Sequence, residues 1–216
     1  MPYLHITTRI ADRKHEDLLQ EKGGKGTPYM AIMDAGGNVL GKPQWPFDPQ
    51  GLAATVAAVE RWRKLEAAGE AGDAVAKLDA MLLGCELGQV PFDELEIDEE
   101  ALSETQRRWY GQLMVDSEVE SLQASLRGGR SPEQIAVLLR DLAAMHAEGS
   151  VPSTPELKHF YWQALGQKAV KEGDRATLAE AIEDLKKTPG LSEMAEAFEK
   201  QWATLPAKDE KGKKDE

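Results

Sequence analysis

The stretch GTPYMAIMDAGGNVL, residues 26–40, decides how the first part of this chain folds. Two short runs rich in apolar residues, Tyr29–Met33 and Asn38–Lys42, are typical of β-strands. The Asp-Ala-Gly-Gly sequence between them supplies residues that tolerate the positive φ of a tight turn. The stretch therefore predicts a β-hairpin, and Thr27-Pro28 stands directly before its first strand.

Further elements are predicted on both sides of this hairpin. Tyr3–Ile10 alternates apolar and polar residues and indicates a strand, while Lys14–Lys22 suits a short helix. Asp48 followed by Pro49 is typical of a helix N-terminus. The apolar residues of that helix recur every three or four positions and share one face: Leu52, Val56, Val59 and Trp62. The predicted order is strand, helix, strand, strand, helix.

This order resembles the C-terminal part of a thioredoxin-like domain over roughly residues 2–66. In that family the loop before the hairpin carries a cis proline and lies against a redox dithiol and the backbone of a bound substrate. The resemblance implies that Thr27 and Pro28 line a substrate or peptide groove. An ordinary trans proline at the start of a strand is the alternative. The family's Cys-x-x-Cys would precede Tyr3, and this sequence does not contain it.

Cys85 is the single cysteine among the 216 residues. Dithiol exchange needs an attacking thiolate and a resolving thiol nearby, so no catalytic residue is predicted. We expect Cys85 to be a small buried residue of a helix. Whether the protein is an enzyme stays open, because the chain could be a redox-inactive binding module or the C-terminal fragment of a thiol–disulfide oxidoreductase with its dithiol upstream. A third alternative is a structural scaffold that uses its helices for oligomerisation. Separately, a missing central strand would leave a sheet edge open to a second copy.

Helix signals replace strand signals from Asp73 onward. Candidate N-cap residues precede successive apolar runs: Asp73, Ser103, Ser131, Thr154, Asp174 and Ser192. For the first of these helices we expect the following residues on the buried face: Val75, Leu78, Leu82 and Cys85. Short links between consecutive helices predict an antiparallel array of helical hairpins.

The helical part resembles tetratricopeptide repeats only in its sequence Trp162-x-x-Leu165-Gly166. Leu178 and Ile182 occupy aligned positions where that family prefers small residues, so we describe the array as repeat-like. Glycines inside the predicted helices have irregular spacing: Gly84, Gly111 and Gly166. Aromatic residues near helical spacing, among them Trp162, are expected to form the core first and to edge a peptide groove second.

The predicted fold class is α/β followed by all-α. We expect a partial thioredoxin-like domain at residues 1–66 and an α-helical repeat-like domain at residues 67–206. Residues 207–216 are charged and without large apolar side chains, which predicts a disordered tail.

The amino-acid composition limits the classes of partner that the protein is expected to bind. The formal net charge of −12 argues against nucleic acid, because such binding depends on cations that neutralise phosphates. The run Asp93–Glu104 is acidic and without basic residues, which favours a solvated segment, with a cation site or a docking patch for a basic partner as the functional alternatives. We expect a protein or peptide partner, with a homo-oligomer through the incomplete sheet edge as an alternative.

Neither a metal nor another cofactor is predicted. The four histidines lack metal-site spacing, and His146 and His159 are expected to be hydrogen-bonded packing residues beside apolar stripes. No apolar run approaches the roughly 20 residues that span a bilayer. No signal peptide is visible, so the chain as written would be cytoplasmic, whereas a start farther upstream would allow the periplasm.

Overall fold

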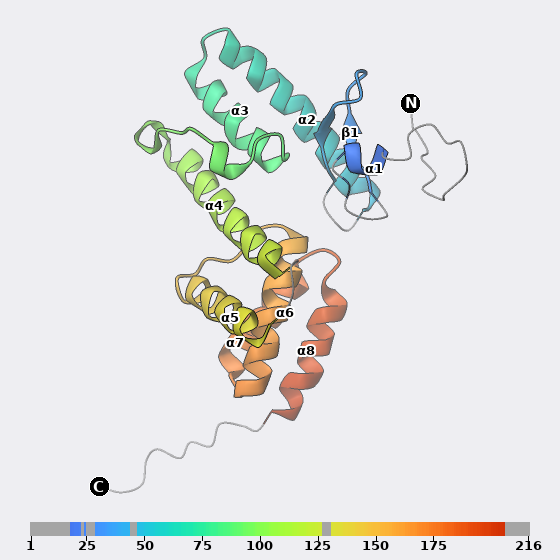
Figure 1. Ribbon diagram of the computed structural model, residues 1–216, viewed down its shortest axis with the longest axis vertical. Helices are drawn as coiled ribbons and strands as arrows, with labels where there is room; N and C mark the ends of the chain where they lie inside the picture. The colour runs from blue at the N-terminus through green and yellow to red at the C-terminus, as the bar shows by residue number, and fades with distance from the viewer. Residues whose placement is uncertain (1–17, 23, 25–28, 44–46, 127–130, 206–216) are drawn as a thin grey trace, which may run out of the picture.

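The computed structural model describes residues 18–22, 24, 29–43, 47–126 and 131–205. The chain is mostly helical and has a two-stranded antiparallel sheet near its N-terminus (Figure 1). The predicted strand Tyr3–Ile10 and the predicted tail at residues 207–216 lie outside the described residues. Of the predicted helix Lys14–Lys22, the structure describes α1 (Leu18–Glu21).

The predicted hairpin is confirmed. Strand β1 (Ile32–Met33) pairs with β2 (Val39–Gly41), and the register is irregular between the two residues of β1. The Asp34 carboxylate closes the turn by accepting hydrogen bonds from the backbone N–H and the side-chain amide of Asn38, at 2.8 and 2.9 Å. Gly37 adopts a φ of 81°, which a residue without a Cβ reaches most easily.

Helices α2 (Pro49–Glu70) and α3 (Ala74–Glu86) pack against each other and carry the hairpin on one side (Figure 1). A small hydrophobic cluster joins strand β2 to both helices: Leu40, Val59, Leu83 and Leu87. Helix α2 continues past residue 66 to Glu70, so the predicted boundary lies inside a helix. The division into residues 1–66 and 67–206 stays a prediction.

The prediction of which face of α3 is buried is wrong in part. Val75 is 63% exposed, whereas its neighbour Ala76 is buried together with Ala80. Gly84, four residues after Ala80 on the same face, lies against Trp62 of α2, so this face of small residues turns toward α2 although Val75 is the more hydrophobic residue. Leu82 is buried as predicted, and Cys85 is half-buried.

Helix α4 (Glu104–Ser125) connects the two halves of the molecule (Figure 1). Before it, the acidic segment forms two 3₁₀ turns, η1 (Phe92–Glu94) and η2 (Glu99–Ala101). Near its start, Trp109 packs against the small cluster of α2 and α3, and farther along Val119 lies in the larger core. One helix therefore belongs to both hydrophobic cores.

The larger core is enclosed by the second half of α4 and by α5 (Pro132–Ala147), α6 (Pro155–Glu172), α7 (Arg175–Lys187) and α8 (Ser192–Thr204). Helix α6 packs against α7, and α7 against α8. The largest fully buried side chains of this core come from α6 and are aromatic: Tyr161 and Trp162.

Most predicted N-caps are confirmed by side-chain hydrogen bonds to the first turn: Asp73, Ser103, Ser131, Thr154 and Asp174. The prediction for Ser192 is wrong, because this residue is the first of α8 and Leu191 takes the N-cap position without a side-chain bond. Leu191 is only 1% exposed. Burial of its side chain in the core fixes the chain at this point, so a polar cap is not required there.

None of the described helices combines the length and the apolarity needed to cross a membrane.

Candidate functional site

Thr27 and Pro28, the two residues that the thioredoxin-like resemblance places in a groove, lie outside the described residues. The hairpin that follows them is described, and Tyr29 at its start is half-buried. The geometry available for a site therefore comes from the helical part of the chain.

Cys85 lies in α3 and is half-buried. The pKa of its thiol is raised to about 11, mainly by burial and in smaller measure by the carboxylates of Glu86 and Glu120. Since the thiolate is the nucleophilic form, this thiol is nearly unreactive at neutral pH. Among the described residues, the interactions that change the pKa of Cys85 all disfavour its thiolate.

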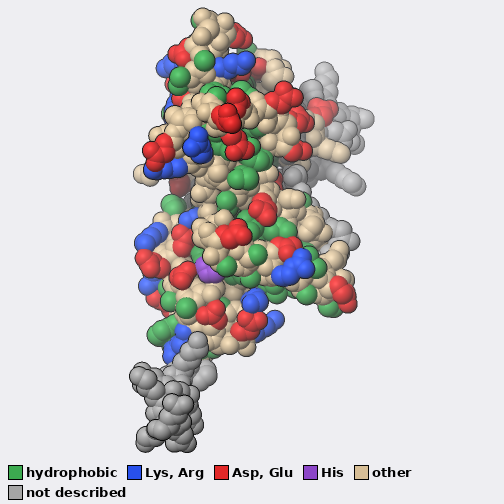
Figure 2. All heavy atoms as spheres, turned by 90° about the vertical axis from the view of Figure 1, so that its left-hand side faces the viewer, with side chains coloured by type: hydrophobic (Ala, Val, Ile, Leu, Met, Phe, Trp, Pro, Cys, Tyr) green, Lys and Arg blue, Asp and Glu red, His purple; other side chains and the backbone are tan. Residues whose placement is uncertain are grey.

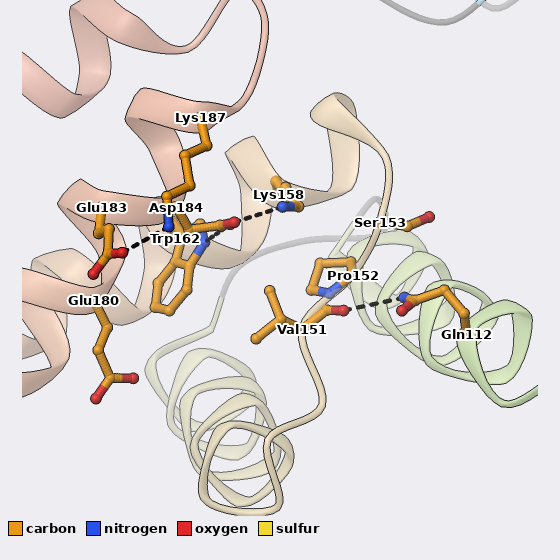
Figure 3. A pocket seen from close by; sticks show the side chains of 10 residues that line it. All are labelled: Gln112, Val151, Pro152, Ser153, Lys158, Trp162, Glu180, Glu183, Asp184 and Lys187. Carbon is orange, nitrogen blue, oxygen red and sulfur yellow. Dashed lines mark hydrogen bonds and ion pairs between the residues drawn. The ribbon is translucent and has the colours of Figure 1, made fainter. Parts of the chain in front are cut away.

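A hollow of about 500 Å³ is lined by several residues that hydrogen-bond to one another (Figure 3). We call it the Asp184 groove. Its apolar floor comes from the link between α5 and α6 and from α6: Val151, Pro152 and Trp162. Its polar and charged edges come from α4, the same link, α6 and α7: Gln112, Ser153, Lys158, Glu180, Glu183, Asp184 and Lys187.

The Asp184 carboxylate is the best-anchored group of the groove. One of its oxygens accepts a hydrogen bond from Lys158 Nζ at 2.6 Å, and the other accepts one from Trp162 Nε1 at 2.7 Å (Figure 3). Charge-assisted bonds of this kind are stronger than neutral ones. Because Trp162 is itself held in the core, the carboxylate has a fixed position at the edge of the groove.

The link between α5 and α6 is tied to α4 by a second polar cluster. Gln112 Nε2 donates to the backbone carbonyl of Val151 at 3.1 Å (Figure 3), and also to the Asp116 carboxylate at 3.2 Å. Asp116 accepts from the backbone N–H of Ser153 at 2.7 Å and from its hydroxyl. These bonds hold the floor of the groove against α4, so the hollow is formed without a ligand.

The rim of the groove is acidic and exposed. Glu180 and Glu183 both project from α7, and Glu183 accepts a hydrogen bond from Lys187 Nζ at 2.6 Å. His146 Nε2 lies 3.5 Å from a Glu180 oxygen, an ion pair when the imidazole is protonated. Burial, with Glu180 and Asp184 as smaller causes, raises the pKa of Tyr161, whose hydroxyl donates to the Ser150 carbonyl at 3.1 Å.

The two histidine predictions have different outcomes. His146 is a packing residue as expected, with its ring edge-on to Trp162 at 5.4 Å between centroids. Its Nδ1 atom, however, is buried and has no hydrogen-bond partner among the described residues. His159 is exposed on α6, so the expectation that it packs beside the apolar stripe is wrong.

A second, smaller hollow of about 300 Å³ lies between α7 and α8. Ala179, Ile182, Glu199 and Trp202 line it. The Arg175 guanidinium stacks over the Trp202 ring, 4.2 Å from its centroid, and donates to the carbonyl of the same residue at 3.1 Å. A single carboxylate makes this hollow poorer in polar groups than the Asp184 groove.

Charge on the surface is mixed, with acidic side chains over both halves of the face in Figure 2 and basic ones among them. In the described part of the chain no group of three or more His, Cys, Asp or Glu is arranged to hold a metal ion. Comparison with protein-family models, with curated proteins and with solved structures finds no match to this chain.

Sequence reasoning placed Trp162 in the core and gave an edge of a groove as its second possible role, but it missed Lys158 and Asp184. A partial signal was present, since Lys158 and Trp162 stand four apart on one helix face. Asp184 comes from the next helix, so its partners depend on how α6 and α7 pack.

Proposed function

We propose that this protein is a redox-inactive module that binds a protein or peptide segment. The observation that carries this proposal is the Asp184 groove, in which a fixed carboxylate stands beside an apolar floor. Ligand sites commonly combine apolar lining with a few well-placed polar groups in this way. The high pKa of Cys85 supports the redox-inactive part of the proposal.

The proposal includes a partial thioredoxin-like unit followed by a repeat-like helical array. The hairpin and the helix α2 behind it support that unit, because both match the order read from the sequence. Thr27 and Pro28 would then provide a second contact for the bound segment. A photo-crosslinking amino acid at position 27 should capture a peptide that the full chain binds, and labelling equal to that of an unrelated surface position would argue against this contact.

Peptide selection tests the binding function directly. We expect a random peptide library displayed on phage to yield enriched sequences on the full chain, and the enrichment to fall on the Asp184→Asn variant. A Glu196→Gln variant, changed at an exposed position of α8, is the matched control and should select as the wild type does. Failure to enrich any sequence, or equal enrichment on all three proteins, would contradict a binding function at this groove.

An insulin-reduction assay tests the proposal that the protein is redox-inactive. The full chain should leave the rate of insulin reduction by dithiothreitol at the rate without protein, because a single thiol of raised pKa cannot complete dithiol exchange. An acceleration that is lost in the Cys85→Ser variant would refute this part of the proposal.

A second candidate function, self-assembly, is favoured by the hairpin. Among the described residues the sheet has two strands, each paired on one side, and Met33 of β1 is 41% exposed. Isolated two-stranded sheets are marginal in stability, and open edges invite pairing with another chain. Light scattering over a hundredfold range of concentration should then detect a dimer, whereas a monomer throughout would count against assembly.

A further inference from the structure

We propose that the Asp184 groove binds an arginine side chain of a basic peptide segment, an inference that rests on the proposed binding function. The Asp184 carboxylate can accept further hydrogen bonds. An ionised carboxylate offers about four acceptor positions. Lys158 and Trp162 supply one donor to each oxygen of Asp184, so both oxygens retain acceptor capacity. The side chain is 27% exposed and lines the hollow, which makes this capacity reachable from solvent.

The charge of the groove also favours a cationic ligand. Three carboxylates and two ammonium groups line the groove, which gives it an excess of one negative charge. Both ammonium groups already have carboxylate partners, Lys158 with Asp184 and Lys187 with Glu183. An anionic ligand would have to displace those partners, whereas a cationic ligand meets acceptors that have room for it.

Glu180 strengthens the preference for a cation. Its carboxylate is 63% exposed, and its contact is with His146 at 3.5 Å, which is attractive in full only when the imidazole is protonated. Figure 3 shows the Glu180 and Asp184 side chains extending from the same helix, α7, at the groove. The net charge of −12 also attracts a basic segment over distances beyond direct contact.

The floor of the groove suits an arginine in particular. A guanidinium is planar and donates up to five hydrogen bonds in a fork that matches a fixed carboxylate. Its methylene stem can lie along apolar surface while the charged end reaches a polar partner. Half-buried Val151 provides this surface, whereas Pro152 and Trp162, which also line the hollow, are almost fully buried, and the bonds of the link to α4 fix the position of Val151.

Fluorescence anisotropy on the full chain tests the inference with fluorescein-labelled GSARLRAGS and the same peptide with both arginines replaced by citrulline. Citrulline keeps the shape of arginine and removes its charge. We expect saturable binding of the arginine peptide, and affinity at least about tenfold weaker for the citrulline peptide, the range of a charge-assisted hydrogen bond. Equal affinity of the two peptides would overturn the inference while leaving peptide binding itself in place.

Protein variants locate the binding. Asp184→Asn should weaken the arginine peptide about tenfold, and Glu180→Gln about two- to fivefold, since the latter is an exposed charge. Glu180→Gln keeps the core intact and therefore stays informative if Asp184→Asn fails to fold. Glu196→Gln, which makes the same charge change outside the groove, should leave affinity unchanged.

Three outcomes count against this inference. Absence of saturable binding overturns it directly. Binding that survives both groove variants and falls when the carboxylates of the run Asp93–Glu104 are replaced by amides places the peptide elsewhere, which also overturns it. If phage selection in addition enriches no peptide of any charge, the proposed function fails as well, so the two failures can be told apart.

Discussion

Gly166 and Gly111 are both glycines inside long helices, and the same substitution should change stability in opposite directions at the two positions. At Gly166 of α6, a Cβ would stand 2.4 Å from Cζ and 2.5 Å from Cε2 of Phe198 on α8. At Gly111 of α4, a Cβ would meet no atom within 4 Å. The pair therefore separates the backbone effect of alanine from its packing effect.

The expected changes in the free energy of unfolding have opposite signs for the two variants. Alanine is favoured over glycine in a helix interior by about 0.5–1 kcal/mol, so Gly111→Ala should stabilise the protein by that amount. Gly166→Ala gains the same term but forces a core ring to move, and overpacking costs about 1–3 kcal/mol. Phe198 is 4% exposed and belongs to the larger core, so its ring has no solvent to move into. The difference is a net loss of up to about 2.5 kcal/mol for Gly166→Ala, with a central value of about 1 kcal/mol.

Urea unfolding followed by far-ultraviolet circular dichroism measures both changes, and unchanged m-values would show that the unfolding transition itself is the same. Phe198→Leu in the Gly166→Ala background removes the ring that causes the clash. The loss in the double variant should therefore be smaller than the sum of the two single losses. A Gly166→Ala protein as stable as Gly111→Ala, or strictly additive losses, would refute this reasoning.

Three other predictions concern a cap, a turn and the thiol. Ser131→Ala removes the N-cap bond of α5 and should lower the free energy of unfolding by about 1 kcal/mol in urea; an unchanged value would contradict the cap's role. The Asn38 side-chain hydrogen bond holds the pKa of Asp34 below its usual 3.8, so the turn is stabilised above that pH and loses this contribution as pH falls through the lower folded value. The amide resonance of Asn38 should titrate with a midpoint below 3.8, and a higher midpoint would show the opposite sign. Cys85 should react with iodoacetamide at pH 8 far more slowly than glutathione does, and equal rates would be inconsistent with its raised pKa.

Local signals in the sequence predicted local structure well. Ser103 and Ser131 each stand three residues before a glutamine, and both capping boxes form. The bonds of each box join residues of a single turn, so the sequence alone is enough to place the caps, although Gln106 also donates to Asp79 of α3. The failure at Ser192 has a tertiary cause, because burial of the preceding leucine decides where α8 begins.

Contacts between helices were beyond what the sequence could predict. Three mid-helix glycines looked alike, yet Gly84 meets Trp62, Gly166 meets Phe198 and Gly111 meets nothing within 4 Å. The Asp184 groove depends on the same kind of information. Its central carboxylate lies 22 residues from Trp162 along the chain, and no spacing rule links positions that far apart on different helices.

The floor of the Asp184 groove is part of the core, so a substitution in the groove can change stability as well as binding. Trp162 is 1% exposed, so ligand binding does not need to order it and loses little conformational entropy there. Asp184 partners this core residue and Lys158, so its removal leaves two donors unsatisfied and should lower both stability and affinity. Glu180 lies at the exposed rim, so its replacement should lower affinity alone. Variants of these two carboxylates that lose affinity and stability in a fixed ratio would indicate that unfolding, and not contact with the ligand, causes the loss.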